Sequence, residues 1–268
     1  MICAGIDGGS RAIKIVLLDT NTQQILASGA CDQGVDHNAL ASKLFDDLLQ
    51  RLHLPRQAVA HIVATGYTRN GIRLAHTTIT EITCHAVGVR RLLPGAMTII
   101  EVGGQDSKLL RLDTNGFVRD FAMNDRCAAG TGRFLEVLAA RLNTSLSALG
   151  DLAARSAHPA SISSTCVVFA ESEIIGLLAS GTPPEDIVAG VQLAIAQRVA
   201  AMAGRELADP LVFTGGVALV PGMREAMENV LGRAVRVAPD PQMTGALGAA
   251  VLAARQVRSA PQIARPTE

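Results

Sequence analysis

Three tight glycine turns, each at the end of a short apolar run, are the parts of this sequence best suited to binding an anion. They are Asp7-Gly8-Gly9-Ser10, Gly103-Gly104-Gln105-Asp106 and Thr214-Gly215-Gly216-Val217. Glycine lets backbone N–H groups approach a phosphate closely and point at it, so no side-chain cation is needed. Acidic residues beside the first two turns suit Mg²⁺, which usually bridges carboxylate and phosphate through its waters. Because the sequence contains neither the Walker pattern nor a G-x-G-x-x-G turn, it predicts a nucleotide site of another kind.

Five cysteines provide a second possible chemistry. Cys3, Cys31, Cys84, Cys127 and Cys166 are odd in number and form no C-x-x-C pair, which argues against a disulfide framework. They could instead be buried thiols, catalytic groups or metal ligands. Cys127 and Cys166 each precede a predicted amphipathic helix, whose N-terminus favours a thiolate. Taken from the residues alone, packing is still favoured over ligation for both.

The other three cysteines are predicted to be structural. Cys3 lies in a predicted strand and Cys31 just past another. Cys84 lies beside Glu81 and His85, which suggests a metal site, but free cysteine is among the most buried residue types. A structural thiol is therefore favoured in each case, although any of them could complete a metal site within one chain.

The first two glycine turns belong to a repeated unit of three short strands. When residues 7–21 are shifted by 94, six of fifteen positions are identical, and Asp7 is matched by Glu101. The strands are expected at 2–6, 13–18 and 24–30, and again at 97–102, 108–112 and 117–122. Two ordinary hairpins that share turn residues are the alternative, but a duplicated strand–turn–strand–turn–strand unit explains the match better.

The rest of the chain is expected to be mainly helical. Apolar spacing predicts helices at 39–52, 133–142, 169–178, 187–202, 222–231 and 246–255, with further strands at 61–65 and 211–213. From residue 256 the apolar period is lost, which predicts a frayed tail. We expect one domain over 1–94 plus 243–257, a second over 95–242 that carries Cys127 and Cys166, and a disordered tail at 258–268.

Composition excludes several classes of function. The chain has 24 basic and 24 acidic residues, no Trp and one Tyr, which leaves no footprint for nucleic acid or an anionic membrane and no base-stacking platform. Its apolar runs are too broken for a membrane span, and its N-terminus lacks the basic region of a signal peptide. We therefore expect a cytoplasmic protein.

Six motifs spread along the chain resemble one family. They are Gly5-Ile6-Asp7-Gly8-Gly9-Ser10, Ala64-Thr65-Gly66-Tyr67, Glu81-Ile82-Thr83-Cys84-His85-Ala86, Gly103-Gly104-Gln105-Asp106, the long block Met123-Asn124-Asp125-Arg126-Cys127-Ala128-Ala129-Gly130-Thr131-Gly132-Arg133-Phe134-Leu135, and Cys166-Val167-Val168-Phe169-Ala170-Glu171-Ser172-Glu173. Duplicated meanders with phosphate turns and a late Thr-Gly-Gly resemble the actin-like ATPase superfamily. Within it, the motifs resemble the ATP-dependent activators of 2-hydroxyacyl-CoA dehydratases and, in part, the ATPase subunits of benzoyl-CoA reductase.

This resemblance implies an α/β, duplicated actin-like (ribonuclease H-like) fold with nucleotide in the cleft between two domains. It implies a homodimer that holds one [4Fe–4S] cluster and uses ATP to deliver one electron to a partner dehydratase or related reductase. An external donor such as ferredoxin or flavodoxin would supply the electron. Cys127 and Cys166 would ligate the cluster. A cube that takes four thiolates would then draw two from each chain across a two-fold axis.

The resemblance also implies roles for residues of the three turns. Asp7, Glu101, Gln105 and Asp106 would be catalytic and hold Mg²⁺, while Gly8, Gly9, Ser10, Gly103 and Gly104 would bind the phosphates. Gly215, Gly216 and Val217 would lie against the nucleoside. Lys14, like its repeat partner Lys108, either contacts phosphate or snorkels from a strand end. The sequence departs from the family at Glu101, where Asp is usual, and at the looser Gly8-Gly9 turn.

Two other functions remain open from the sequence. One is a small-molecule kinase of the same superfamily, and the other is a nucleotide-switched ATPase that binds a protein. Neither would give Cys127 and Cys166 a reason to precede two helices. Asp125 and Arg126 either face a partner or form a solvated pair, and Glu171 and Glu173 are expected in the first turn of a helix.

Overall fold

The computed structural model describes residues 1–125, 127–163, 166–204 and 207–259. The chain forms two compact units, Met1–Gly88 with Gly245–Glu268, and Val89–Thr244. The predicted boundary after residue 94 lies six residues beyond the observed one, and the predicted boundary after residue 242 lies two residues before it. Each unit contains one five-stranded mixed sheet.

The sheet of the first unit has the strand order β3-β2-β1-β4-β5. Its strands are β1 (Ile2–Gly8), β2 (Ala12–Asp19), β3 (Ile25–Asp32), β4 (Val59–Thr65) and β5 (Thr77–Thr78). The first three form an antiparallel meander, and β4 runs parallel to β1. The four strands predicted in this part of the sequence are therefore confirmed, with ends that differ by at most two residues.

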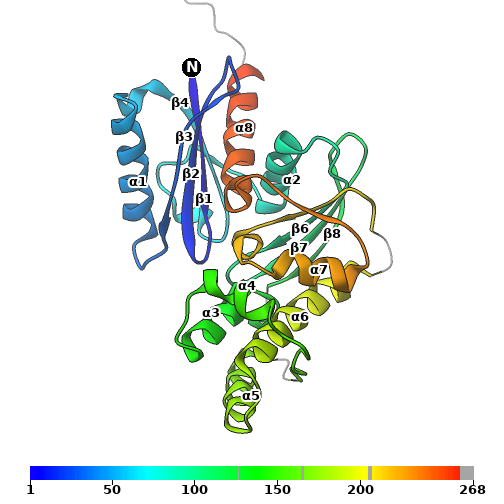
Figure 1. The fold of residues 1–268 in the computed structure, drawn as a ribbon. Coiled ribbons are helices and arrows are strands. Elements are labelled where there is room, and N and C mark those ends of the chain that lie inside the picture. Colours follow the sequence, from blue (N-terminus) through cyan, green and yellow to red (C-terminus); the bar gives the residue numbers. More distant parts are fainter. Residues whose placement is uncertain (126, 164–165, 205–206, 260–268) are drawn as a thin grey trace, which may run out of the picture. The chain divides into compact units, whose positions relative to one another are not determined.

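Two helices cover opposite faces of this sheet, as Figure 1 shows for α1 (His37–Arg51) and α8 (Thr244–Ser259). Successive side chains of a strand point to opposite faces. In β1, Ala4 and Ile6 join the core packed against α1, whereas Gly5 faces α8. A Cβ on Gly5 would lie 2.0 Å from the carbonyl oxygen of Ala246, so the close approach of α8 requires glycine there.

The sheet of the second unit has the order β10-β9-β6-β7-β8. Its strands are β6 (Thr98–Val102), β7 (Ser107–Leu112), β8 (Val118–Asn124), β9 (Leu211–Thr214) and β10 (Val235–Val237). Its helices are α3 (Gly132–Arg141), α4 (Leu149–Ala153), α5 (Val167–Ala179), α6 (Pro184–Ala203) and α7 (Met223–Leu231). Helix α2 (Glu81–Leu92) crosses the boundary between the two units.

The two sheets repeat one topology. In each, a three-stranded antiparallel meander is followed by a strand parallel to its first strand. The ladder between the second and third strands shifts register after Leu17 in the first unit and after Arg111 in the second. These positions are 94 residues apart, the offset found in the sequence, and this agreement confirms the predicted duplication.

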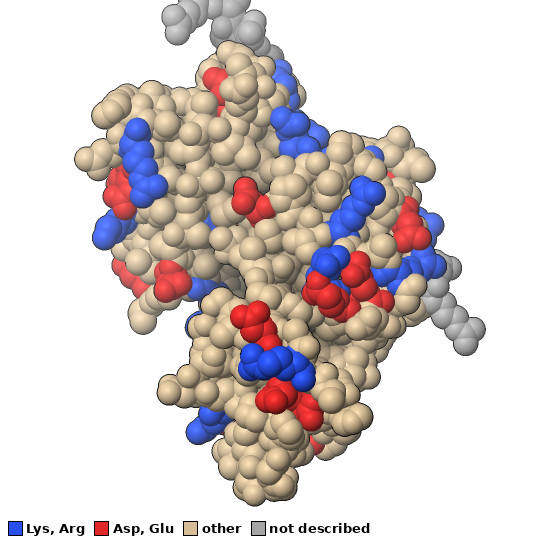
Figure 2. Space-filling model, viewed as in Figure 1, with Lys and Arg blue, Asp and Glu red and all other residues tan. Residues whose placement is uncertain are grey.

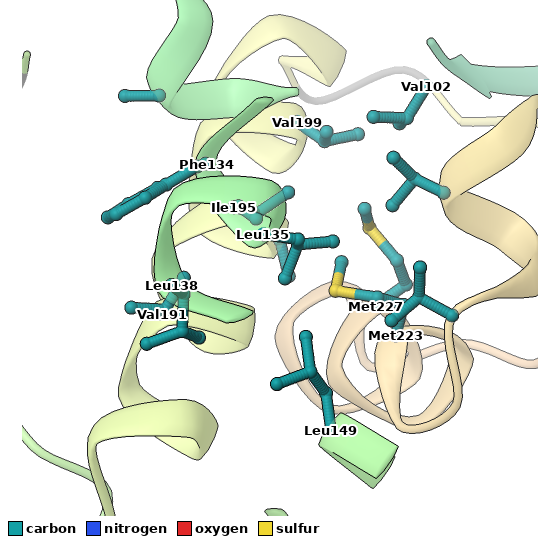
Figure 3. Close-up of a cluster of buried hydrophobic side chains, with 14 of the residues drawn as sticks. Val102, Phe134, Leu135, Leu138, Leu149, Val191, Ile195, Val199, Met223 and Met227 are labelled. Atoms are coloured by element: carbon teal, nitrogen blue, oxygen red, sulfur yellow. The ribbon is translucent and has the colours of Figure 1, made fainter. Parts of the chain in front are cut away.

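The core of the second unit lies between its sheet and its helices. Figure 3 shows Leu135 of α3 and Ile195 of α6 converging with Met223 and Met227 of α7. Helix α6 is long and apolar enough, by length and composition alone, to cross a membrane, but its most apolar window is 56% buried inside the protein. A core helix passes the same test, and α6 contributes many of the buried residues of this cluster.

Several elements differ from the sequence-based predictions, which also lacked β5, α4 and β10. Helix α2 was not predicted, although Cys84, His85 and Val89 form its buried side. Helix α5 begins at Val167 rather than 169, so Glu171 lies beyond its first turn, where it had been expected. Glu173 lies two residues further along α5, so it is also beyond the first turn.

The last helix extends further than predicted, into the segment that had been expected to be a frayed tail. Helix α8 continues to Ser259, and residues 260–268 lie outside the description. The Ser259 hydroxyl donates to the carbonyl oxygen of Arg255 at 2.9 Å. The last turn is solvent-exposed, so the apolar period ends before the helix does, which explains the early prediction of fraying.

Charged side chains are dispersed on the face of the molecule shown in Figure 2. Lys and Arg lie among Asp and Glu, separated by uncharged surface, without an extended patch of one sign on that face. This distribution agrees with the balanced composition of the sequence.

Candidate functional site

The first glycine turn joins β1 to β2 and holds a carboxylate beside it. Asp7 is buried, and its Oδ2 accepts a hydrogen bond from Lys14 Nζ at 3.0 Å. The two residues are direct partners in the β1–β2 ladder. A Cβ on Gly9 would lie 2.8 Å from Lys14 Nζ, and one on Gly8 would lie 2.4 Å from the Thr68 hydroxyl oxygen. A side chain at either glycine would therefore displace the Lys14 ammonium or the Thr68 hydroxyl from its present position.

The second glycine turn repeats this arrangement between β6 and β7. Lys108 Nζ donates to Glu101 Oε2 at 2.9 Å and to Asp106 Oδ2 at 2.8 Å. Glu101 and Lys108 are direct ladder partners, as Asp7 and Lys14 are. Lys108 is 1% exposed, so it does not snorkel into solvent; its ammonium pairs with the carboxylates instead.

The hairpin bonds decide which N–H groups of these turns can meet a phosphate. Gly9 N–H donates to Ala12 O at 3.1 Å, and Gly103 N–H donates to Asp106 O at 2.9 Å. In the described part of the chain, the N–H groups of Gly104 and Gln105 donate to no protein acceptor. Ser10 occupies the matching bend of the first turn. The anion-binding donors are therefore expected one or two residues after Gly9 and Gly103.

The third glycine turn packs directly on the second. Gly215 has a positive φ of 89°, and a Cβ on it would lie 2.3 Å from Val102 O and 2.8 Å from Glu101 Oε1. Gly216 is exposed and has open space around its Cα. The Val217 side chain is buried in the core of the second unit, so only its backbone remains available to a nucleoside.

His85 is a residue of this region that sequence reasoning did not connect with Asp7. It lies on the buried side of α2 and is 5% exposed. A Cβ on Gly245, at the start of α8, would lie 3.1 Å from Asp7 Oδ2 and 3.2 Å from His85 Nε2. The carboxylate and the imidazole therefore converge at Gly245, the second residue of α8. Sequence analysis missed this relationship because it did not predict helix α2, which carries His85.

Cys127 begins a short 3₁₀ turn, Ala128–Gly130, that leads into α3. Its thiol is half-buried, and its backbone is held by Asn124, the last residue of β8. Asn124 Nδ2 donates to Cys127 O at 2.9 Å, and Cys127 N–H donates to Asn124 Oδ1 at 3.1 Å. Asp125 is exposed, and Arg126 lies outside the described residues.

Cys166 stands at the N-terminus of α5 with its side chain exposed. Its carbonyl oxygen accepts from Ala170 N at 2.8 Å, the first bond of the helix. Glu173 accepts hydrogen bonds from the backbone N–H and the hydroxyl of Ser163, both at 2.8 Å, and so holds Ser163 against α5. Glu171 forms an ion pair with Arg141, which joins α5 to the end of α3. Both glutamates therefore have structural partners.

The donor set of Cys127 and Cys166 fits an iron–sulfur cluster better than that of the other cysteines. Each of the two thiols lies directly before a helical segment, and neither is fully buried. Thiolate sulfur is the usual ligand of such clusters. Among the described residues, no group of three or more potential metal-ligating side chains is present. Cys127 and Cys166 of one chain would therefore supply two of the four thiolates that a [4Fe–4S] cluster takes.

The other three thiols have the properties of structural cysteines. Cys3 and Cys84 are fully buried, and Cys31 packs partly against the core of the first unit. Burial raises the pKa of Cys3 and Cys31 above the ordinary value, and raises the pKa of Cys84 to about 12. Protonated, buried thiols are poor metal ligands.

Comparison with known proteins decides the family. The BadF/BadG/BcrA/BcrD ATPase family matches residues 4–253, nearly the whole chain. The chain belongs to this ATPase family. The resemblance to this family that the sequence motifs indicated is therefore confirmed. The two glycine turns with their carboxylates belong to a BadF/BadG/BcrA/BcrD ATPase.

Two proteins with assigned roles are similar to this chain over almost their full length. The activator of lactoyl-CoA dehydratase from Anaerotignum propionicum is 44% identical over 94% of this chain and 97% of its own. The (R)-2-hydroxyglutaryl-CoA dehydratase activating ATPase from Acidaminococcus fermentans is 41% identical over 93% and 95%.

A solved structure extends the likeness to three dimensions. The activator of the 2-hydroxyisocaproyl-CoA dehydratase from Clostridium difficile with bound ADPNP has a TM-score of 0.93 and 39% identity, and covers 100% of both chains. The predicted α/β, duplicated actin-like ATPase fold is confirmed for this family member. Nucleotide binding follows from membership of the ATPase family, while the role of each turn residue stays a prediction.

Proposed function

We propose that this chain is an ATP-hydrolysing iron–sulfur protein that activates a partner 2-hydroxyacyl-CoA dehydratase, or a related reductase, by ATP-driven transfer of one electron. The observation that carries the proposal is the pair of accessible thiols, Cys127 and Cys166, at the starts of two helical segments in a member of an ATPase family. The names of its relatives, which describe dehydratase activators, support the choice of partner.

For the ATPase half of the function, each glycine turn has a proposed task. The N–H groups of Gly104 and Gln105, and those around Ser10, bind phosphate oxygens. Asp7 and Glu101 would hold Mg²⁺, which would supply positive charge to the phosphates. Lys14 and Lys108 fix these two carboxylates in place through their ion pairs. Gln105, exposed in its turn, orients the attacking water.

For the redox half, the exposed face of α5 supports a two-fold dimer. Val168 and Phe169, two and three residues after Cys166, are 69% and 70% exposed, and Ile175 extends the same side of the helix. A Cβ on Gly176 would meet nothing within 4 Å. In Figure 2 the lower end of the region occupied by α5 carries almost no charge. An apolar exposed face suits a protein contact better than water.

A second copy packed on this face would bring two further cysteines to Cys127 and Cys166. A [4Fe–4S] cluster bound by the four thiolates would supply a one-electron carrier. The electron would come from an external low-potential donor such as ferredoxin or flavodoxin and pass to the partner, while ATP and water yield ADP and phosphate. Such thiol chemistry suits the reducing cytoplasm, where we expect the protein to work.

The test is purification without oxygen, followed by measurement of iron, sulfide and oligomeric mass. We expect about four irons per two chains, the content of one cluster, and a cluster potential that differs between ATP and ADP. An iron-free protein after anaerobic reconstitution that still binds ATP would overturn the redox proposal. Phosphate transfer to a small molecule would then identify a kinase, and nucleotide-dependent protein capture a switch.

A further inference from the structure

The second glycine turn and the Cys127 turn are joined by direct hydrogen bonds. Thr131, which is fully buried, lies between them. Its hydroxyl approaches Ala128 O at 2.7 Å and Gly104 O at 3.1 Å. Gly132 N–H donates to Gly103 O at 2.9 Å, and Arg133 N–H donates to Gly104 O at 3.0 Å. The first N–H groups of α3, which lack partners within a helix, are therefore satisfied by the glycine turn.

The peptide units of the turn have two opposite sides. In a trans peptide the N–H and the preceding C=O point in opposite directions and move as one rigid plane. The plane that carries Gly103 O also carries Gly104 N–H, and the plane that carries Gly104 O also carries Gln105 N–H. The carbonyl side of both planes holds α3, so their N–H groups point away from α3, where the phosphate is proposed to bind.

Cys127 is fixed at the other end of this connection. Asn124 clamps its backbone through the two bonds described above, and Ala128, the next residue, accepts from the Thr131 hydroxyl. Asn124 is itself the ladder partner of Ser107, which directly follows the Gly103–Asp106 turn. The Cys127 turn is thus attached to both ends of the second glycine turn.

We infer that Thr131 and Asn124 are positioning residues that make the backbone at Cys127 respond to the occupant of the Gly103–Gly104 turn. This inference rests on the proposed function, because it assumes that nucleotide phosphate binds that turn. When a phosphate accepts hydrogen bonds from Gly104 N–H and Gln105 N–H, the two peptide planes rotate toward it. The rotation moves the carbonyl oxygens that α3 and the Thr131 hydroxyl hold, and the Cys127 turn moves with them.

Cys166 provides an internal comparison. Its carbonyl oxygen accepts a hydrogen bond from within α5, and Ser163, three residues earlier, is held by Glu173 of the same helix. A nucleotide effect that passes through the Thr131 hydroxyl should therefore appear at the Cys127 turn and be weaker at the start of α5.

Hydrogen–deuterium exchange of the full-length protein, purified without oxygen, tests the connection. Exchange is compared between saturating ADP and saturating non-hydrolysable ATP analogue, for peptides over 127–133 and over 167–173. The matched variants are Thr131→Val, which removes the hydroxyl at constant shape, and Thr131→Ser, which keeps it. Occupancy is established for each protein by direct nucleotide binding.

We expect the exchange rate over 127–133 to differ at least about threefold between the two nucleotides in the wild type and in Thr131→Ser, the factor that one net hydrogen bond contributes. The difference should disappear in Thr131→Val. If Thr131→Val does not fold, Asn124→Ala, at a partly exposed position, should reduce the same difference.

Three further results separate the possible failures. An unchanged nucleotide response in a folded Thr131→Val or Asn124→Ala protein would overturn the inference and leave the proposed function standing. The same holds for a wild type that binds both nucleotides without any difference over 127–133. A protein that binds neither nucleotide would overturn the proposed function and the inference together.

Discussion

Lys108 lies buried in the β6–β7 hairpin and donates to Glu101 at 2.9 Å, across the strand pair that carries the second glycine turn. Lys14 makes the same contact with Asp7 at 3.0 Å in the β1–β2 hairpin, 94 positions earlier. Although the side chain of Glu101 is longer than that of Asp7, the distance from its carboxylate to the lysine ammonium is nearly the same. The duplication has preserved an ion pair as well as a backbone, and the departure from Asp at position 101 is accommodated locally.

The first prediction concerns this buried pair. Glu101→Gln removes one of two carboxylates from an ammonium that cannot reach water. Breaking a buried pair costs about 3–5 kcal/mol when no other partner remains. Because Asp106 remains, we expect a loss of about 1–3 kcal/mol in the free energy of unfolding, together with loss of ATP hydrolysis.

Urea denaturation without nucleotide measures the stability term, and phosphate release measures the activity. Asp46→Asn is the matched control, because Asp46 pairs with Arg56 on the surface, where such pairs contribute about 0–1 kcal/mol. Equal stability losses in the two variants would contradict the structural role assigned to Lys108.

The second prediction concerns the cysteines. Cys127→Ser and Cys166→Ser should each abolish iron binding and activation of a dehydratase partner, since serine oxygen does not replace a cluster thiolate. Nucleotide affinity, measured by calorimetry, should stay within about threefold of the wild type, less than the tenfold change that 1.4 kcal/mol produces. The Cys31→Ser variant, which changes a half-buried thiol of the first unit, should retain iron. Iron loss in all three variants would instead indicate general misfolding.

The third prediction concerns the exposed face of α5. Phe169→Glu places a charge in the proposed contact between two copies and should convert the dimer to monomer in light scattering. Phe117→Glu is the matched control, because Phe117 is 71% exposed but lies in the turn between β7 and β8. We expect that variant to remain dimeric. Dimers of both proteins would exclude α5 as the interface.

The fourth prediction concerns pH. Burial raises the pKa of Cys84 from 9.0 to about 12, so the folded state favours the protonated thiol. The stability that this thiol contributes is complete below pH 9.0, the pKa of an unperturbed cysteine, and is lost as the pH rises toward about 12. Cys84→Ala should therefore lose less stability than the wild type between these pH values.

Circular dichroism during denaturation at stepped pH measures this difference. Ser259→Ala, at an exposed position at the end of α8, is the control and should follow the wild type. A Cys84→Ala profile parallel to that of the wild type would show that ionisation of Cys84 does not contribute to alkaline unfolding.

Much of the fold could be predicted because its signals are local. Short apolar runs that end in glycine mark the strands of both meanders. Lys14 and Lys108 occupy equivalent positions in the two meanders and show that they are 94 residues apart. Helix α2 was missed because its buried side includes Cys84 and His85, which do not read as an apolar stripe. The end of α8 was missed because exposed helical turns carry no apolar period.

The duplicated meander, the three glycine turns and the two cysteines before helices can be predicted from the sequence, because each depends on residues close together along the chain. What those residues contact follows from the folded structure. It committed the N–H groups of Gly9 and Gly103 to hairpin bonds, placed His85 beside Asp7, and joined Thr131 to Gly104 across 27 positions. Hydrogen bonds and buried ion pairs depend on distance and direction in space. Those quantities are fixed by packing and not by spacing in the sequence.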